Sequence, residues 1–320
     1  MTGRPFRFAV GAGRATDRHA VVERARLAES LGYSTFLVSD HLLDQLAPLQ
    51  LLSSVAEATT RLRIGTFVLN NDLRHPAVLA QELASLDVLS GGRLEIGLGA
   101  GWNIDEYRAA GISYDRHGVR FERMTEALTV LKGLLSDAAE PFRFSGKHYQ
   151  ISALEGFAAV KPQQRPHPPF LIGGGGRLAL TFAAGEAQIV GLAPRLPRPA
   201  EPDVRSLLAE ATAEKVDWVR AAAGERFSDL ELNTYGSLGP AQITDDARSA
   251  ARALAERLKG RYGCELTEDE VLESPHTFIG TVDQLVQKCL MLRERFGLSY
   301  IFPIAEPEAF APIVERLAGK

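Results

Sequence analysis

Four consecutive glycines, Gly173–Gly176, follow the strand-like run Phe170–Ile172 and precede a helix-like segment. Because glycine has no Cβ, such a run lets the backbone turn sharply and approach a ligand closely. The free amides at the start of the next helix favour an anion, and Arg177 adds a positive charge there. The sequence therefore predicts a phosphate site at Gly173, Gly174, Gly175, Gly176 and Arg177. A tight strand-to-helix turn without a ligand is the alternative.

Asp40 and His41 end a second strand-like run, Phe36–Ser39, whose side chains alternate as a barrel strand requires. Side chains at such a strand end project into the mouth of a barrel, where an imidazole can act as an acid or a base near neutral pH. We therefore predict catalytic roles for His41 and Asp40. In the alternative, Asp40 caps the next turn and His41 lies on the rim.

Two further strand ends carry residues suited to a flat ligand. In Gly65–Asn71 we expect the backbone to bulge toward the ligand and Asn70 to offer its amide to a heteroaromatic edge. In Gly97–Asn103 small residues allow close backbone approach, and Trp102 supplies a flat wall. The ligand-contacting residues predicted here are Thr66, Phe67, Val68, Asn70, Ala100, Gly101, Trp102 and Asn103. A polar loop and a tight strand exit with Trp102 packed in a core are the alternatives.

Short β-branched or aliphatic runs alternate with helix-length periodic segments along the whole chain. Strands are expected at Phe6–Val10, Thr35–Ser39, Leu62–Leu69, Leu94–Leu98, Phe170–Ile172, Ile189–Leu192, Leu230–Asn233 and Tyr300–Phe302. Helices are expected at Asp17–Leu31, Leu46–Thr59, Pro76–Leu89, Arg120–Leu135, Leu178–Ala184, Val204–Ala223, Asp245–Leu258, Val282–Phe296 and Glu308–Leu317. Eight alternations predict an α/β fold, a single (β/α)8 barrel with its chemistry at the carboxyl ends of the strands.

The competing fold is a doubly wound open sheet, whose phosphate fingerprint follows the first strand. Here Gly11-Ala12-Gly13 is followed by Arg14-Ala15, without the third glycine, so the barrel is favoured. We see no domain boundary and expect residues 1–320 to form one domain. Irregular stretches at about 141–169 and 194–230 are expected to be insertions over the active-site mouth, the first with a small hairpin.

The composition excludes several classes of protein. The net charge is -4 and no basic stripe is visible, which argues against nucleic-acid binding. The longest apolar runs are strand-sized, so no membrane association is expected. The N-terminal residues lack the apolar core of a signal peptide, and Cys264 and Cys289 are read as reduced thiols, so a cytoplasmic location is expected. No cluster has metal-ligand spacing.

The motifs together resemble the luciferase-like flavin and deazaflavin oxidoreductase superfamily, above all its actinobacterial-type F420-dependent oxidoreductases. They occur in family order over residues 6–305. The matching pieces are Ser39–His41, Arg61–Thr66, His75–Ala77, Ser90–Leu94, Gly97–Asn103, Glu106–Tyr107, Arg120–Arg123, Lys161–Pro162, Pro168–Pro169, Gly173–Gly175 and Gly280–Thr281.

The resemblance implies a luciferase-like (β/α)8 barrel whose cofactor ring lies against a bulge after the third strand. That bulge often contains a non-proline cis peptide, which would fall near Phe67-Val68. The loop Gly173–Gly176 would hold the cofactor phosphate. His41 would lie near the reactive edge of the ring, and Asp40 would contact the ring.

The resemblance further implies an F420-dependent oxidoreductase that transfers hydride between F420 and a small organic substrate. The ending Ser39-Asp40-His41 favours F420, and FMN is the alternative cofactor. The alternative functions are an FMN-dependent luciferase-like monooxygenase, with a separate flavin reductase as partner, and a non-catalytic flavin- or F420-binding protein. A homodimer is common in the superfamily.

Overall fold

The fold is a (β/α)8 barrel. The computed structural model describes residues 4–13, 16–42, 45–138, 140–153, 160–198 and 200–320. The barrel strands are β1 (Arg7–Gly11), β2 (Thr35–Val38), β3 (Arg63–Thr66), β5 (Leu94–Gly99), β8 (Phe170–Gly174), β9 (Ile189–Leu192), β12 (Glu231–Tyr235) and β15 (Leu298–Phe302). Within this fold the chain forms two compact units, each described by itself below.

The first unit comprises Met1–Ala12, Arg26–Phe36 and Leu171–Lys320. Its strands pair in parallel in the order β8, β9, β12, β15 and β1, and the register places Gly173 beside Gly191 and Gly191 beside Asn233. The helices of this unit are α6 (Arg177–Glu186), α7 (Ala209–Ala223), α8 (Ala247–Tyr262), α9 (Glu268–Glu273), α10 (Val282–Phe296) and α11 (Pro307–Leu317). Its short strands are β10 (Arg195–Arg198), β11 (Glu201–Asp203), β13 (Gln242–Ile243) and β14 (Ile279–Gly280), and its 3-10 turns are Val204–Leu207 and Gly224–Asp229.

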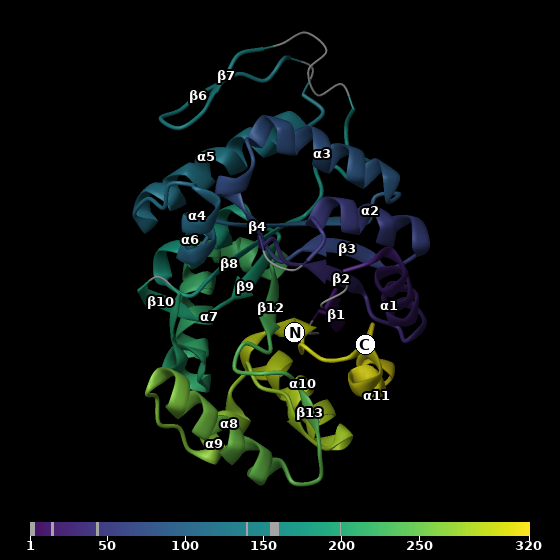
Figure 1. The fold of residues 1–320 in the computed structure, drawn as a ribbon, viewed down its shortest axis with the longest axis vertical. Coiled ribbons are helices and arrows are strands. Elements are labelled where there is room, and N and C mark those ends of the chain that lie inside the picture. The colour runs from purple at the N-terminus through teal and green to yellow at the C-terminus, as the bar shows by residue number, and fades with distance from the viewer. Residues whose placement is uncertain (1–3, 14–15, 43–44, 139, 154–159, 199) are drawn as a thin grey trace. The chain divides into compact units, whose positions relative to one another are not determined.

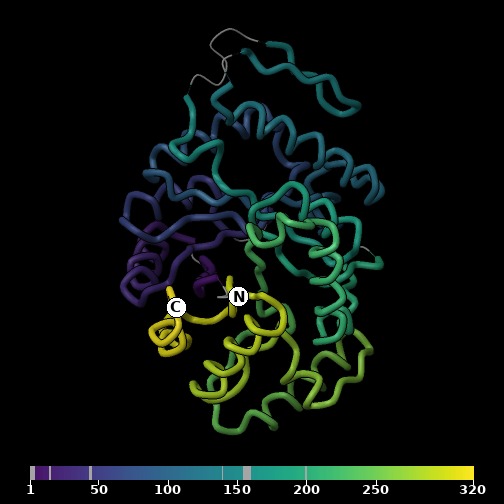
Figure 2. The backbone as a smooth tube through the Cα atoms, turned by 180° about the vertical axis from the view of Figure 1, so that it is seen from behind, coloured from purple at the N-terminus to yellow at the C-terminus, as the bar shows by residue number. Residues whose placement is uncertain are grey.

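Local sequence signals explain where the helices of this unit begin and end. Capping boxes begin α9 at Thr267 and α10 at Thr281. In each, the threonine hydroxyl accepts a hydrogen bond from the amide three residues later, and the side chain of that later residue accepts one from the threonine amide. Gly297 ends α10 in the left-handed conformation, which glycine adopts without a Cβ penalty. The two ends of the described chain meet where Phe6 donates its amide to Lys320 O and accepts from Gly319 N (Figure 2).

The second unit comprises Gly13–Ala25 and Leu37–Phe170. Its helices are α2 (Pro48–Ala58), α3 (Pro76–Leu89), α4 (Ile104–Ala110) and α5 (His117–Leu135); α1 (Arg18–Ser30) runs from this unit into the first. Its other elements are β4 (Leu69–Asn70), the 3-10 turn Asn71–Leu73, β6 (Phe144–Ser145) and β7 (Gln150–Ile151). Figure 1 shows α3 packed between α2 and α5, as their contacts confirm.

The side chain of Glu126 on α5 holds the hairpin β6–β7, a contact that we call the clamp. The carboxylate of Glu126 accepts hydrogen bonds from the amides of Lys147, His148 and Tyr149 at 2.8 to 3.1 Å. Burial raises the pKa of Glu126, but these backbone hydrogen bonds outweigh it and lower that pKa below its ordinary value. The hairpin is therefore tied to α5 by an ionised side chain, and the small hairpin predicted from the sequence is confirmed.

Replacing Glu126 by glutamine is expected to loosen this hairpin. Hydrogen bonds to a charged acceptor contribute about 1.5–3 kcal/mol each, so losing the charge should speed amide exchange at residues 147–149 by about 30-fold. Hydrogen exchange read by mass spectrometry or NMR measures the effect. Glu122→Gln is the matched control, because Glu122, one turn earlier on α5, contacts the side chains of Lys147 and His148, whereas Glu126 accepts the backbone amides whose exchange is measured. Equal exchange in both variants would contradict the clamp.

The structure differs from the predicted elements in several places. The short helices α4 and α9 were not expected, because neither has a long apolar stripe. The predicted helix Val204–Ala223 is present as α7, which packs on α6, but its first residues, Val204–Leu207, form a 3-10 turn, and a second 3-10 turn follows at Gly224–Asp229. Residues 154–159 and 199, within the two predicted insertions, lie outside the described residues, as do Arg14 and Ala15.

Candidate active site

A bulge interrupts the third barrel strand at Phe67-Val68. The pairing of β3 with β5 joins Gly65 to Glu95, whereas β4 joins Leu69 to Leu98, so four steps on one strand face three on the other. The bond between Phe67 and Val68 is a cis peptide, as the family resemblance implies. The amide of Phe67 donates to Val38 O at 2.7 Å, which joins the bulge to the end of β2.

Glycines on and after β5 leave the room that the bulge occupies. A Cβ at Gly97 would overlap the carbonyl oxygen of Thr66, and one at Gly99 would lie 2.7 Å from Val68 Cγ2. A Cβ at Gly101, whose φ is +75, would overlap the hydroxyl of Tyr107. The Gly-x-Gly-x-Gly spacing is therefore explained by close approach of the backbone to its own bulge.

Asp40 is buried and holds the bulge from the end of β2. Its Oδ2 accepts from the amide of Asn70 at 2.9 Å and from Arg74 Nη1 at 2.6 Å, and its Oδ1 accepts from Arg74 Nη2 at 3.1 Å. This two-pronged ion pair fixes the orientation of the carboxylate. Asp40 therefore positions the strand that carries Asn70, and its predicted catalytic role remains a prediction.

His41 is paired with a buried carboxylate from α4. His41 Nδ1 lies 2.7 Å from Glu106 Oε1, and the same oxygen accepts from Asn103 Nδ2 at 2.6 Å. The side chain of His41 is 24% exposed and that of Glu106 is 6% exposed. The ring of Trp102 meets the His41 ring edge-on, with centroids 5.7 Å apart. This geometry orients an imidazole that solvent or a ligand can reach.

A second polar network, formed by Tyr107, Asp72 and Arg123, holds the side chain of Asn70. The hydroxyl of Tyr107 lies 2.9 Å from Asn70 Oδ1 and 3.0 Å from Asp72 Oδ2. Burial and the charge of Asp72 raise the pKa of Tyr107 well above its ordinary value, so the phenol is a neutral donor near pH 7. Arg123 neutralises Asp72 through an ion pair of 2.9 Å. The network fixes Asn70, and its phenol stays protonated at neutral pH.

Arg120 organises the loop after β5. Its guanidinium donates to the carbonyl oxygens of Ala100 and Gly101, both at 3.2 Å, and lies 3.9 Å from the ring centroid of Tyr114. Because Arg120 is only 3% exposed, these contacts fix the backbone that leads to Trp102. Arg120, near the start of α5, is therefore buried against this loop.

The second unit thus gathers most of the predicted ligand-contacting residues. Phe67, Val68, Asn70, Ala100, Gly101, Trp102 and Asn103 all belong to the bulge, its glycine-rich neighbour or the His41 pair. Thr66 differs from these residues, because its buried hydroxyl is hydrogen-bonded within the sheet. It accepts from Gly97 N and donates to Gly97 O, both at 2.9 Å. Sequence reasoning did not assign Glu106 to the site, although the motif Glu106-Tyr107 contributed to the resemblance.

The glycine loop lies in the first unit, between β8 and α6. Gly176 is the N-cap of α6 and makes no side-chain hydrogen bond to the helix, so the first amides of α6 have no side-chain cap. A Cβ at Gly175 would overlap the carbonyl oxygen of Pro194, and one at Gly174 would lie 2.6 Å from Ala179 Cβ. Arg177 is exposed. Gly174 and Gly175 are therefore required by packing against Ala179 and Pro194, and an anion at the uncapped start of α6 remains a prediction.

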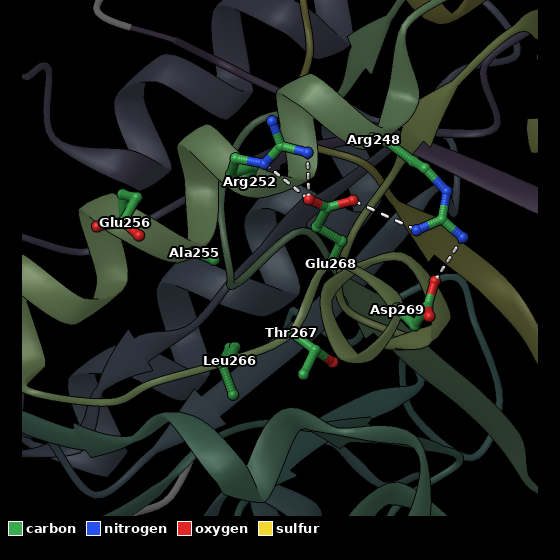
Figure 3. A pocket seen from close by; sticks show the side chains of 8 residues that line it. All are labelled: Arg248, Arg252, Ala255, Glu256, Leu266, Thr267, Glu268 and Asp269. Carbon is green, nitrogen blue, oxygen red and sulfur yellow. Dashed lines mark hydrogen bonds and ion pairs between the residues drawn. The ribbon is translucent and has the colours of Figure 1, made fainter.

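A surface hollow of about 400 Å³ lies between α8 and α9 of the first unit (Figure 3). Its two arginines are already paired: Arg252 Nη2 lies 2.6 Å from Glu268, and Arg248 contacts Glu268 and Asp269 at 3.3 and 3.0 Å. None of the predicted site residues lines it. Because its charges satisfy one another, the hollow is read as a solvated ion-pair network.

Each unit presents groups that suit one part of a flavin-type cofactor. In the second unit Phe67 and Val68 are half-buried at the bulge and Trp102 is 44% exposed, so flat apolar surface and a reachable imidazole occur together. In the first unit the uncapped start of α6 suits a phosphate. Among the residues described, no group of three His, Cys, Asp or Glu is arranged to hold a metal ion, and no helix is long and apolar enough to cross a membrane.

Relatives of known activity match part of the chain. The F420-dependent glucose-6-phosphate dehydrogenase of Amycolatopsis mediterranei is 33% identical over 163 residues, 48% of this chain and 47% of that protein. The FMNH(2)-dependent dimethylsulfone monooxygenase of Pseudomonas putida is 29% identical over 164 residues, 51% of this chain and 44% of that protein. The chain therefore spans about half the length of the curated relatives it matches.

The fold as a whole is shared with solved structures. The coenzyme F420-dependent tetrahydromethanopterin reductase from Methanopyrus kandleri superposes with a TM-score of 0.75 over 99% of both chains, at 18% sequence identity. A family model described as luciferase-like monooxygenase matches residues 4–284. Since that match takes in most of the chain, the protein belongs to the luciferase-like monooxygenase family.

Proposed function

We propose that this chain is an F420-dependent oxidoreductase that transfers hydride between F420 and a small organic substrate. The observation that carries the proposal is His41, a partly exposed imidazole held by the buried carboxylate of Glu106 at 2.7 Å. Such a pair suits proton transfer to or from a reacting group. The F420-dependent relatives from actinobacteria support the choice of cofactor.

When bound, F420 supplies the hydride chemistry through its deazaflavin ring. The chain would bind that ring against the bulge at Phe67-Val68, which Asp40 and the glycines of β5 hold in place. His41 would move a proton at Nε2, because Nδ1 is occupied by Glu106. The loop Gly173–Gly176 would bind the phosphate with backbone amides and the start of α6.

An FMN-dependent monooxygenase is the second candidate. The dimethylsulfone monooxygenase relative favours it, and a phosphate loop serves FMN as well as F420. Such an enzyme would need reduced flavin from a reductase. The non-catalytic alternative is weaker, because the pairing of His41 with Glu106 is intact. A homodimer, which rests on the resemblance, and a cytoplasmic location, which rests on Cys264 and Cys289 being read as reduced thiols, are further proposals.

Titrating the purified protein separately with F420 and with FMN tests the proposal. We expect F420 to bind with micromolar or tighter affinity, read by its fluorescence or by calorimetry, and FMN to bind at least about tenfold more weakly. Tight FMN binding without a response to F420 would overturn the choice of cofactor. Binding of neither would overturn the proposed function.

Replacing Gly175 by alanine is expected to weaken F420 binding by at least about tenfold. The added methyl group would overlap the carbonyl oxygen of Pro194 and displace the loop, so that one or more amide–phosphate hydrogen bonds are lost. Gly176→Ala is the matched control, because a Cβ there meets nothing within 4 Å. Calorimetry compares the two dissociation constants. Normal binding by the Gly175 variant would show that this loop does not hold the phosphate.

A further inference from the structure

We infer that Glu106 is the positioning residue of His41: its carboxylate fixes the imidazole with the proton on Nδ1 and makes Nε2 the atom that exchanges a proton with the substrate. This inference rests on the proposed function, which assigns proton transfer to His41, and it adds that the charge of Glu106 decides the tautomer and the rate. It concerns only residues of the second unit.

The first support is the arrangement of donors on one oxygen. Glu106 Oε1 receives Asn103 Nδ2 at 2.6 Å and lies 2.7 Å from His41 Nδ1. An amide NH2 can only donate, so it orients the carboxylate without competing for a proton. A buried carboxylate beside Nδ1 favours the tautomer that carries its proton there. A proton gained at Nε2 is then compensated by the neighbouring negative charge.

The second support is the position of Glu106 on its helix. Glu106 is the third residue of α4 after the N-cap Asn103, where a glutamate ordinarily reaches back to the N-cap amide in a capping box. Glu270 in α9 and Gln284 in α10 do so in this chain. At α4 the side chain of Asn103 accepts no backbone amide of the helix, and Glu106 contacts His41 Nδ1 and Asn103 Nδ2 instead. Its side chain is therefore diverted from stabilising its own helix.

The third support is the contact between the His41 ring and Trp102. Trp102 meets the His41 ring at an interplanar angle of 86°. The backbone at Trp102 is itself held, since Tyr114 Oη donates to Trp102 O at 3.2 Å and Arg120 binds the two preceding carbonyl oxygens. The imidazole is thus limited in rotation by an aromatic edge and in tautomer by a carboxylate, which is the arrangement a proton-transfer group needs.

Nitrogen-15 NMR of the protein without cofactor tests the inference directly. In the wild type we expect His41 to show a protonated Nδ1 and an unprotonated Nε2 at a pH where the ring is neutral. In Glu106→Ala the preference for one tautomer should be lost, and the two ring nitrogens should show averaged shifts. The control is Glu270→Ala, which removes a glutamate from the same helical position in α9 and should leave the His41 signals unchanged. Unchanged His41 signals in Glu106→Ala would overturn the inference.

Kinetics with F420 then separates positioning from structure. Glu106→Gln keeps the shape of the side chain but removes its charge, so we expect kcat to fall by about 100-fold while the F420 dissociation constant stays within about threefold. In the His41→Ala background the same change should have no further effect, because Glu106 acts through His41. Equal losses in both backgrounds would overturn the inference. If F420 does not bind at all, the proposed function fails, and the NMR result still decides the role of Glu106.

Discussion

Replacing His41 by alanine is expected to lower the turnover number with F420 by about 100- to 10,000-fold, the range that positioned acids and bases contribute. The physical reason is that the imidazole is the partly exposed titratable group beside the bulge, held by Glu106 at 2.7 Å. The F420 dissociation constant should stay within about threefold, because the bulge is fixed by Asp40 and not by His41. Steady-state kinetics and fluorescence titration on the same preparation measure both quantities.

His19→Ala provides the control for this prediction, since His19 is exposed on α1. It should leave turnover and cofactor binding unchanged. Circular dichroism of the His41 variant should match the wild type, because its side chain is only half-buried and is not part of the core. Turnover that survives His41→Ala would remove His41 from the chemistry.

The arrangement of the barrel was predictable because each barrel strand carries its own local signal. Short aliphatic runs bounded by glycine, proline or aspartate gave all eight strands to within a few residues. The third strand shows the limit: the run Leu62–Leu69 looks continuous, but the structure divides it into β3 and β4. The division depends on glycines some thirty residues later in the chain, which no local pattern at Leu62–Leu69 contains.

The site could be predicted where the residue type alone indicates the chemistry. It was harder to predict where the role of a residue depends on a partner side chain far away in the sequence. His41 and the glycine loop stand out by type. The role of Asp40 depends on Arg74, and that of His41 depends on Glu106, 65 residues away. Glu106 lies in a helix of 7 residues that has no long apolar stripe to announce it. Only its tertiary contact with His41 assigns Glu106 to the site.

Acid should destabilise this protein through His276, which is fully buried in the first unit. Its Nδ1 lies 3.2 Å from Tyr235 O and 3.1 Å from Ser237 Oγ. Burial, with the nearby charge of Lys215, lowers the pKa of His276 to about 3. An unfolded histidine binds a proton below its ordinary pKa of 6.5, whereas His276 in the folded chain does not, so stability is lost as the pH falls below 6.5.

At about pH 5 the expected loss is about 2 kcal/mol relative to about pH 7.5, because each pH unit below the unfolded pKa costs about 1.4 kcal/mol. Urea unfolding at the two pH values measures it. His276→Asn places an amide near the position of Nδ1 and does not titrate, so it should be less stable at neutral pH but should lose about 2 kcal/mol less on acidification.

Two buried lysines affect the stability of the fold at higher pH than His276 does. Burial lowers the pKa of Lys288 to about 7 and that of Lys215 to about 8. Because an unfolded lysine stays charged up to its ordinary pKa of 10.5, both lysines make the protein more stable as the pH rises from 7 toward 10.5. Burial also lowers the pKa values of His117 and His167, so both contribute to the loss between neutral pH and about pH 5. The difference between His276→Asn and the wild type isolates the share of His276. If His276→Asn kept the full acid dependence, the buried imidazole would have to be charged in the folded chain, and its pairing with Tyr235 and Ser237 would need another explanation.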